Sequence, residues 1–290
     1  MAQFKFVAIG TSWQIDIYDA LSPHDEEKIL KTIKDRIEEF EQTYSRFRDD
    51  SLISKISREG GEYILPDDAE PMLSLYRELY ALTDGLVTPL IGGLISDAGY
   101  DANYTLVPKQ NLKSPPSWDD VMAYKHPVLS VKKPVSLDFG AAGKGYLIDL
   151  VGKLLEENSI KGYCIDAGGD ILRKAKDNKP MRIGLENPQN TTEAVGVYEL
   201  TNGSICGSAG SRRAWGNFTH IINPKTQTSP RDIIAVWVMA DSALLADALT
   251  TCLFFVPAAK IREAYKFEYV LLNKDYSVEK SEGFSGELFL

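Results

Sequence analysis

One acidic residue stands alone in a long apolar stretch near the C-terminus. Asp247 is the only charged residue between Asp241 and Lys260, and Thr251 follows it by four residues. Because four residues make about one helical turn, the side chains of Asp247 and Thr251 would face the same way. A buried carboxylate without a partner is costly, and Mg²⁺ prefers oxygen ligands and completes its shell with phosphate and water. The pattern favours a metal site over the alternative, a half-exposed Asp247 with Thr251 bonding back to its own helix.

A second candidate site is the glycine-rich segment 140–145, which lies between an expected strand and an expected helix. Glycines let the backbone approach a ligand closely, and the first amides of the helix favour an anion such as phosphate. Lys144 adds a positive charge there. The segment is not a Walker A loop, because Asp138 stands where the first glycine would be and Gly145 stands where Ser or Thr is required. A turn with purely structural glycines is an equally good interpretation.

Three further segments suit ligand binding. His220 lies between apolar residues just before an Asn-Pro turn, where a lone histidine is more often structural than catalytic. Gly168-Gly169-Asp170 follows an expected strand and indicates a tight turn beside a bulky group. The segment 207–213 joins small residues to two arginines, which suits an anion, although a solvated basic turn is equally common.

The composition is that of an acidic globular protein. The 290 residues include 32 Lys and Arg against 41 Asp and Glu, which gives a net charge of −9. This balance argues against nucleic acid or an anionic membrane as the main partner. The three cysteines are far apart, which excludes a disulfide framework and a cysteine-based zinc site and indicates a reducing compartment. Neither a signal peptide nor an apolar run of about 18 residues is found, so we expect a cytoplasmic protein without a membrane span.

Hydrophobic periodicity predicts the elements that position these residues. Because strands and helices mix without strict alternation, we predict an α+β fold. Helices are expected at about 23–42, 68–83, 145–158 and 242–256, whereas 96–128 is expected to be rich in loops. Strands are expected at 4–9, 13–18, 135–139, 162–166, 181–185, 195–200, 233–239 and, as the last one, 269–273.

Taken in order, six blocks resemble the motifs of the ApbE family of FAD:protein FMN transferases across nearly the whole chain. Each block alone is a weak signal, but the ordered set is specific. The first three blocks are Gly10-Thr11-Ser-Trp13 for M-G-T-x-Y/W, Tyr44-Ser-Arg-Phe47-Arg-Asp-Asp-Ser51 for F-S-x-Y-x-x-x-S, and Val87-Thr-Pro-Leu-Ile-Gly92 for D-P-T-V-G-P-L. The fourth block has two parts, Asp138-Phe-Gly-Ala-Ala-Gly-Lys144-Gly-Tyr-Leu-Ile-Asp149 for D-L-G-A-I-A-K-G-Y-A-V-D and Asp166-Ala-Gly-Gly-Asp170 for N-x-G-G-D. The last two are Ser208-Ala-Gly210 with His220-Ile-Ile-Asn-Pro224 for T-S-G and H-I-I-D-P-R-T-G, and Ala246-Asp247-Ala-Leu-Thr-Thr251 for A-D-A-L-x-T.

The resemblance implies a fold and an activity. The fold is the T-fold-like ApbE architecture, an α+β domain over residues 1–290 with mixed or antiparallel sheets, flanking helices and an FAD cleft. Two lobes, roughly 1–130 and 131–290, are a possible subdivision. The activity is Mg²⁺-dependent transfer of the FMN part of FAD, its substrate, to a Thr or Ser hydroxyl of an acceptor flavoprotein, with release of AMP.

The resemblance also assigns residues. Asp247, Thr251 and the backbone carbonyl of Ala141 match the Mg²⁺ ligands, and the expected catalytic residues are Asp247, Lys144 and His220. His220 is the candidate base, since a histidine with a free pKa of about 6.5 titrates near working pH. The residues that match FAD contacts are Ile9, Phe47, Ala98, Gly99, Tyr100, Asp138, Lys144 and Ile221. Among them, the resemblance aligns Ala98, Gly99 and Tyr100 with the loop that lines the adenine side of FAD.

Several positions depart from the family motifs. Phe47 stands where the family usually has Tyr, Asn223 replaces the Asp of H-I-I-D-P, and residues 94–101 lack the usual Trp. Two alternative functions remain. One is an Mg²⁺-dependent FAD pyrophosphatase that gives FMN and AMP, with water in place of the acceptor hydroxyl. The other is a flavin-binding protein without turnover, against which the isolated Asp247 argues, because binding FAD alone does not require a buried cation site.

Overall fold

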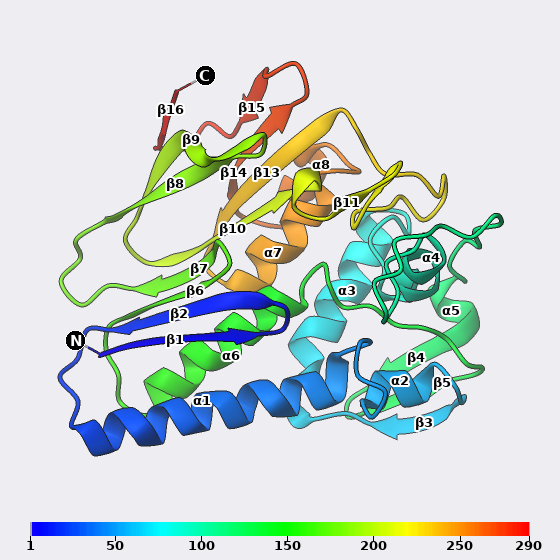
Figure 1. Ribbon diagram of the computed structural model, residues 1–290, viewed down its shortest axis with the longest axis horizontal. Coiled ribbons are helices and arrows are strands. Elements are labelled where there is room, and N and C mark those ends of the chain that lie inside the picture. Colours follow the sequence, from blue (N-terminus) through cyan, green and yellow to red (C-terminus); the bar gives the residue numbers. More distant parts are fainter. Residues whose placement is uncertain (1, 290) are drawn as a thin grey trace.

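An eight-stranded antiparallel sheet forms the centre of the molecule in the computed structural model, which describes residues 2–289 (Figure 1). The sheet begins with the hairpin of β1 and β2 and ends at β15, in the order β1-β2-β6-β7-β10-β13-β14-β15. The strands are β1 (Ala2–Ala8), β2 (Thr11–Ile17), β6 (Tyr163–Ala167), β7 (Asp170–Lys174), β10 (Gly203–Ala209), β13 (Ile233–Ala240), β14 (Glu268–Asn273) and β15 (Val278–Lys280).

The central strands of this sheet are buried on both faces. In β13, Val236 and Val238 belong to one hydrophobic core, whereas Trp237 and Met239 belong to another. Successive side chains of a strand point to opposite faces, so the two cores lie on the two sides of the sheet. This double burial explains why β13 reads as an almost continuous apolar run rather than as an alternating one.

Helices cover the face of the sheet that carries Val236 and Val238, called the first face below. Helix α1 runs beneath the β1–β2 hairpin (Figure 1). The sequence fixes the start of α1 locally, because the Ser22 hydroxyl accepts a hydrogen bond from the Asp25 amide and Pro23 occupies the first turn. Its buried side chains recur every three or four residues and enter the core shared with α6 and α7. The covering helices are α1 (Pro23–Tyr44), α3 (Glu70–Leu82), α6 (Gly143–Glu157) and α7 (Ala243–Cys252).

Smaller elements complete the fold. A three-stranded sheet in the order β16-β9-β8 covers the second face, and another in the order β3-β5-β4 lies beyond α3 (Figure 1). These strands are β3 (Gly61–Ile64), β4 (Met122–Lys125), β5 (Val128–Val131), β8 (Met181–Asn187), β9 (Asn190–Leu200) and β16 (Glu287–Leu288), with the pair β11 (Ala214–Trp215) and β12 (Phe218–Thr219). The short helices are α2 (Leu52–Ile56), α4 (Gly92–Asp97), α5 (Trp118–Val121) and α8 (Ala258–Arg262), with the 3₁₀ turns η1 (Asp67–Ala69), η2 (Pro89–Ile91) and η3 (Gly210–Arg212).

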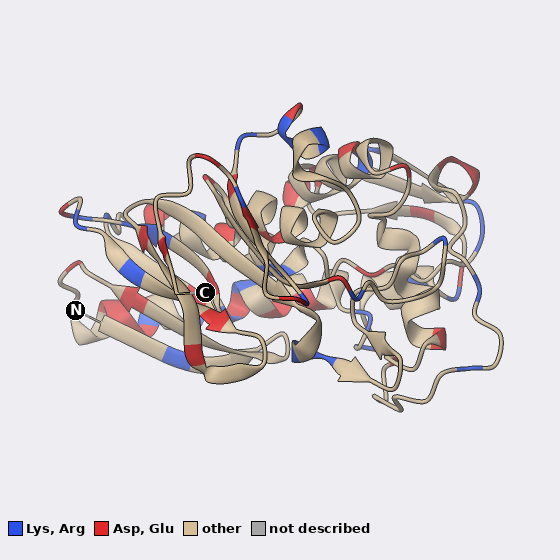
Figure 2. Ribbon diagram, turned by 90° about the horizontal axis from the view of Figure 1, so that it is seen from above, with Lys and Arg blue, Asp and Glu red and all other residues tan. Residues whose placement is uncertain are grey.

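The structure confirms the predicted α+β class, with antiparallel sheets flanked by helices. The four predicted helices are present as α1, α3, α6 and α7. The predicted cysteine behaviour also holds, because Cys164, Cys206 and Cys252 are free and buried. Within residues 2–289, no helix combines the length and apolarity needed to cross a bilayer. Figure 2 shows Lys and Arg interspersed with Asp and Glu along the chain rather than gathered on one element.

Two strand predictions are wrong. Residues 135–139 join no sheet, because two of their amides bond to other elements instead: Val135 N–H donates to Ile56 O at the end of α2, at 3.4 Å, and Asp138 N–H donates to Pro89 O at the start of η2, at 2.7 Å. The strand at 269–273 is not the last one, since β15 and β16 follow it. The strands β4, β5, β7 and β10 have no counterpart among the predicted elements, because they are short and follow turns or loop-rich sequence.

Candidate active site

A cavity of about 300 Å³ opens where the first face of the sheet meets the segments beyond α3. It has two chemically different ends. The polar end is formed by Ala141, Lys144, Ser208, His220 and Thr251 at its wall, with Asp247 directly behind. The aromatic end is formed by Arg46, Phe47, Tyr100 and Tyr104. All of these residues except Asp247 line the cavity, together with Ile9, Asp138, Arg213 and Ile221.

Asp247 lies in the second turn of α7 and is only 5% exposed. Its Oδ2 accepts a hydrogen bond from the Gly145 amide in the first turn of α6, at 2.8 Å. A Cβ on Gly145 would lie 2.1 Å from the Ala243 carbonyl oxygen, so only glycine lets the two helices approach this closely. Burial raises the pKa of Asp247, against the opposing effects of the Lys144 charge and the Gly145 amide.

The residues around Asp247 fit a hard cation. Within residues 2–289, no Lys, Arg or His nitrogen lies within 4 Å of the Asp247 carboxylate, so the buried acid has no protein cation as an ion-pair partner. Ala141 and Thr251 line the cavity, and their residue types offer a carbonyl and a hydroxyl oxygen. A carboxylate, a hydroxyl and a carbonyl form the oxygen donor set that Mg²⁺ prefers, with positions left for phosphate and water. The described chain has no cluster of three or more His, Cys, Asp or Glu, so a soft transition-metal centre is not supported there.

Lys144 is the positive charge of the polar end. Its ammonium pairs with the carboxylate of Asp170, which is 1% exposed and also accepts a hydrogen bond from the Gly207 amide at 3.0 Å. This buried anchor fixes the lysine while its side chain, 28% exposed, still reaches the cavity. In the first turn of α6, the Gly143 amide donates to Phe139 O at 2.7 Å and the Gly145 amide donates to Asp247 at 2.8 Å. The Lys144 ammonium is therefore the group of this turn that is placed to attract an anion in the cavity.

His220 lies at the cavity wall with its Nδ1 buried and without a hydrogen-bond partner in the described chain. Burial lowers the pKa of His220 to about 4, and the nearby charges of Arg213 and Lys144 act in the same direction. Burial beside positive charges disfavours the imidazolium, so His220 in the free protein is a weaker base than a free histidine. The ring is neutral at pH 7, which leaves a lone pair available to accept a proton.

Aromatic rings and a guanidinium group make the other end. Phe47 and Tyr104 stack with ring centroids 5.3 Å apart, and Tyr100 meets Phe47 edge-on at 5.6 Å. The carbon at the centre of the Arg46 guanidinium lies 4.2 Å from the Phe47 centroid, on a residue that the sequence motifs leave unassigned. Trp215 stacks behind Tyr100 at 5.6 Å, so a tryptophan reaches this end from a distant part of the chain although residues 94–101 contain none.

The structure brings together most of the predicted FAD contacts. Ile9 lies in the β1–β2 turn with φ of 45°, a left-handed conformation that is unusual for a β-branched residue and concentrates at functional sites. Ala98 and Gly99 do not line the cavity: Ala98 is buried, and its carbonyl accepts a hydrogen bond from Trp215 Nε1 at 2.7 Å. The predicted contacts that do line it are Ile9, Phe47, Tyr100, Asp138, Lys144 and Ile221.

Sequence reasoning missed three contributors to the cavity. Arg46 sits at a variable position of its motif, and Tyr104 lies in a segment expected to be loop. Ser208 was part of a motif without an assigned role, and its hydroxyl bonds to Thr250 on α7 at 2.8 Å. The only sequence signal for Arg46 and Tyr104 is their residue type, because an arginine among aromatic residues is typical of a binding surface.

Comparison with known proteins places the chain among flavin transferases. The model of the ApbE family matches residues 9–270. The FAD:protein FMN transferase of Escherichia coli K12 is 22% identical over 286 residues, which cover 90% of this chain and 80% of that protein. The FAD:protein FMN transferase of Rhodobacter capsulatus is 27% identical over 195 residues, which cover 63% of this chain but 37% of that protein.

Solved structures share the fold. The ApbE protein of Thermotoga maritima superposes with a TM-score of 0.83 at 21% identity, covering 98% of this chain and 97% of that one. The flavin transferase ApbE of Vibrio cholerae gives a TM-score of 0.81 at 21% identity, with the same coverage of 98% and 97%.

Proposed function

The chain belongs to the ApbE family, and on that premise we propose that it is an FAD:protein FMN transferase. The reaction attaches the FMN part of FAD to a Thr or Ser hydroxyl of an acceptor flavoprotein and releases AMP. The observation that carries this proposal is the buried Asp247, which pairs with no Lys, Arg or His among residues 2–289 and bonds to Gly145, directly after the cavity residue Lys144.

Asp247, Thr251 and the Ala141 carbonyl would hold Mg²⁺. When bound, the ion would supply Lewis-acid stabilisation for the negative charge on a diphosphate. The family match and the oxygen donors at the polar end support this assignment. Asp247 is the residue on which we expect metal binding to depend most, because it is the only charged member of the set.

The chain's own residues then provide binding and positioning. Lys144 lines the cavity, where its ammonium would bind the phosphates and withdraw charge from them. The acceptor oxygen forms a new ester bond to the FMN phosphorus, and the bond from that phosphorus to the bridging oxygen of the diphosphate breaks. AMP carries that oxygen away. In phosphoryl transfer of this kind, the protein contributes mainly position and charge.

His220 is the proposed acceptor of the hydroxyl proton. A neutral imidazole with a pKa of about 4 is a weak base in the free protein. Bound phosphates would raise this pKa, because negative charge favours the imidazolium. The proton would then lie on a ring nitrogen of His220 until product release.

A pyrophosphatase is the second candidate, because water in place of the acceptor hydroxyl gives FMN and AMP from the same site. The test incubates the purified protein with FAD and Mg²⁺, with and without a candidate acceptor domain. AMP is measured by chromatography and covalent flavin by fluorescence after denaturing electrophoresis. A transferase releases AMP and labels the acceptor only when the acceptor is present; AMP release without acceptor identifies the hydrolase.

Asp247→Ala is the decisive variant. We expect it to abolish AMP release and flavin attachment and to remove the Mg²⁺ dependence, with an unchanged circular dichroism spectrum. Asp241→Ala, at an exposed acid just before the same helix, is the matched control and should behave as the wild type. Mg²⁺-dependent flavin attachment by Asp247→Ala would overturn the metal assignment.

A further inference from the structure

Arg46 holds a buried donor that no residue in the described part of the chain uses. Its side chain is only 7% exposed, yet it lines the cavity. Nε donates to the Asp138 carboxylate, and Nη1 donates to Ser96 Oγ at 3.4 Å. Nη2 is buried and has no hydrogen-bond partner among residues 2–289. Because a buried donor without a partner is costly, this nitrogen is expected to have one when the cavity is filled.

The guanidinium is held in one orientation by its surroundings. Its central carbon lies 4.2 Å from the centroid of Phe47 and 5.2 Å from that of Tyr100. Asp138 cannot turn away from the pair, because its Oδ1 already accepts a hydrogen bond from the Gly140 amide at 2.7 Å. Stacking and the ion pair therefore pre-organise Arg46, which lowers the entropy cost of binding a ligand through it.

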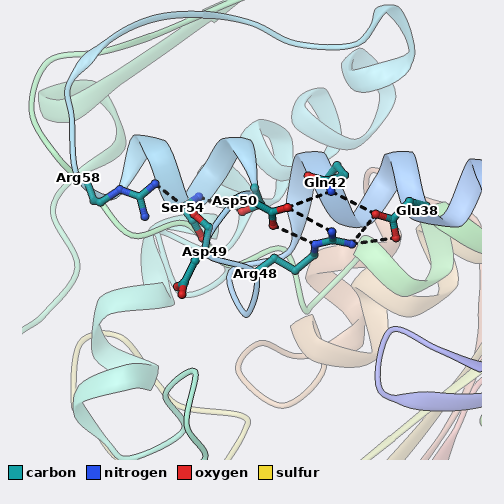
Figure 3. Close-up of polar contacts among 8 residues, drawn as sticks. Glu38, Gln42, Arg48, Asp49, Asp50, Ser54 and Arg58 are labelled. Atoms are coloured by element: carbon teal, nitrogen blue, oxygen red, sulfur yellow. Dashed lines mark hydrogen bonds and ion pairs between the residues drawn. The ribbon is translucent and has the colours of Figure 1, made fainter.

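A polar network also anchors the loop that carries Arg46, as Figure 3 shows. The neighbouring Arg48 binds both carboxylate oxygens of Glu38 on α1, at 2.8 and 2.9 Å. Gln42, one turn further along α1, bonds to Asp50 at 3.1 Å, and Arg48 reaches the same carboxylate at 3.2 Å. Each contact is exposed and weak alone, but together they tie both ends of the short loop to the helix.

The position of Arg46 points to the AMP half of the dinucleotide. Ser96, its hydrogen-bond partner, lies on α4, directly before the Ala98–Tyr100 segment that the family motifs align with the adenine side. Phe47 lacks the hydroxyl that the family usually has at that position. A guanidinium packed on the Phe47 ring would therefore supply the polar contact that the tyrosine hydroxyl cannot.

We propose that Arg46 is a specificity-determining residue that donates a hydrogen bond from Nη2 to an acceptor atom in the AMP half of FAD. The inference rests on the proposed function, since it takes FAD as the ligand of the cavity. AMP and FMN are the probes that separate the two halves of the dinucleotide.

The test measures dissociation constants for FAD, AMP and FMN with Mg²⁺ present, by calorimetry and flavin fluorescence, in the wild type and in Arg46→Met. We expect FAD and AMP to bind about tenfold more weakly to Arg46→Met, as for a lost hydrogen bond from a charged group, whereas FMN changes by less than about twofold. Arg77→Met is the matched control: its guanidinium also stacks on two aromatic rings and pairs with an acid, but it lies outside the cavity.

Two further variants keep the inference falsifiable if Arg46→Met destabilises the fold by leaving Asp138 without its partner. Arg46→Met combined with Asp138→Asn removes the lone charge, and Arg46→Lys keeps an ammonium for Asp138 but loses the second donor. Both should still show weaker FAD and AMP binding. Unchanged AMP affinity in these variants, or an equal loss for FMN, would overturn the inference, as would a wild type that binds neither FAD nor AMP.

The two proposals fail in different ways. A wild type that transfers flavin while Arg46→Met binds AMP normally keeps the proposed function and refutes the role of Arg46. A wild type that never forms covalent flavin or AMP, but binds AMP through Arg46, refutes the proposed function alone.

Discussion

The two ends of the cavity are built in different ways. The polar end rests on the helices α6 and α7 and on β10, and its acids are held by backbone amides: Gly145 donates to Asp247 and Gly207 to Asp170. The aromatic end rests on loops. Tyr104 there has a left-handed φ of 50° and is 52% exposed, and Phe47 is 36% exposed.

This difference matches the tasks proposed for the two ends. Charge stabilisation at a phosphorus requires groups fixed in place, because a small displacement of a donor costs a large part of its effect. Recognition of a leaving group tolerates substitution of the protein residues that bind it, since contacts between flat aromatic rings are broad and adaptable. The chain departs from the family motifs at the aromatic end, at Phe47 and in residues 94–101. At the polar end it departs at Ser208 and Asn223 but keeps the proposed metal ligands Asp247 and Thr251. We therefore expect substitutions at the polar end to have the larger effects.

Gly145→Ala should have the largest effect. The new methyl group would meet the Ala243 backbone at 2.1 Å and the Asp247 Cβ at 2.7 Å, and backbone cannot move aside as a flexible side chain can. We expect a loss of at least about 3 kcal/mol in unfolding free energy, together with loss of flavin transfer. Urea unfolding measures the first and the electrophoretic fluorescence assay the second.

Gly93→Ala in α4 is the matched control for Gly145→Ala. No atom lies within 4 Å of the new methyl group, so we expect the unfolding free energy to rise by about 0.5–1 kcal/mol. Similar losses of unfolding free energy in Gly145→Ala and Gly93→Ala would contradict the idea that the polar end alone is tightly packed.

Stability should also depend on pH through Asp149, which lies behind the polar end and accepts hydrogen bonds from the Ala243 and Leu244 amides, both at 2.8 Å. Burial raises the pKa of Asp149 to about 6, above its ordinary value of 3.8. The folded state therefore holds this proton more tightly than the unfolded state, and the resulting stabilisation is complete below pH 3.8 and lost as pH rises through about 6. The full difference is about 3 kcal/mol.

Urea unfolding of the wild type and of Asp149→Asn between pH 4 and pH 7 measures this effect. Asparagine does not titrate, so the fall in unfolding free energy over this range should be smaller in the variant. An equal fall in both proteins would assign the pH dependence to another group.

Lys144→Met tests the positive charge of the polar end. We expect kcat/KM for flavin transfer to fall about a hundredfold, as for other lost transition-state contacts. Because Asp170 would be left buried without its partner, the double variant with Asp170→Asn separates the loss of charge from destabilisation. Lys153→Met, on the exposed side of the same helix, should leave the kinetics unchanged. A single and a double variant as active as the wild type would remove Lys144 from the site.

Tyr104→Ala should have the smallest effect. It removes the outer ring of the stack on Phe47, and we expect KM for FAD to rise about five- to tenfold with an unchanged kcat, since such a ring contributes about 1 kcal/mol. Tyr104→Phe keeps the ring and should resemble the wild type. A large fall in kcat for Tyr104→Ala would erase the distinction between the two ends.

Much of the fold was predictable from local patterns. The helices α1 and α3 were found by their apolar periodicity, and β13 by its apolar run. The segment 135–139 has the composition of a strand, but whether a strand pairs depends on neighbours far away in sequence, and here they are the end of α2 and the start of η2. The strands β7 and β10 were not predicted for a related reason. Their hydrogen bonds to neighbouring strands of the sheet, more than their own residue types, determine their extended structure.

The sequence alone determined the family motifs and the separation of one acid from all other charges in its stretch, because residue type and helical spacing are local properties. Only the tertiary structure decided that Asp247 meets the Gly145 amide across 102 positions, that Arg46 faces Asp138 across 92, and that Trp215 stacks on Tyr100. It also decided the charge state of His220, because burial beside Arg213 and Lys144 lowers its pKa. The physical reason is common to all four: contact, solvent exclusion and electric field depend on distance through space, which chain order does not encode.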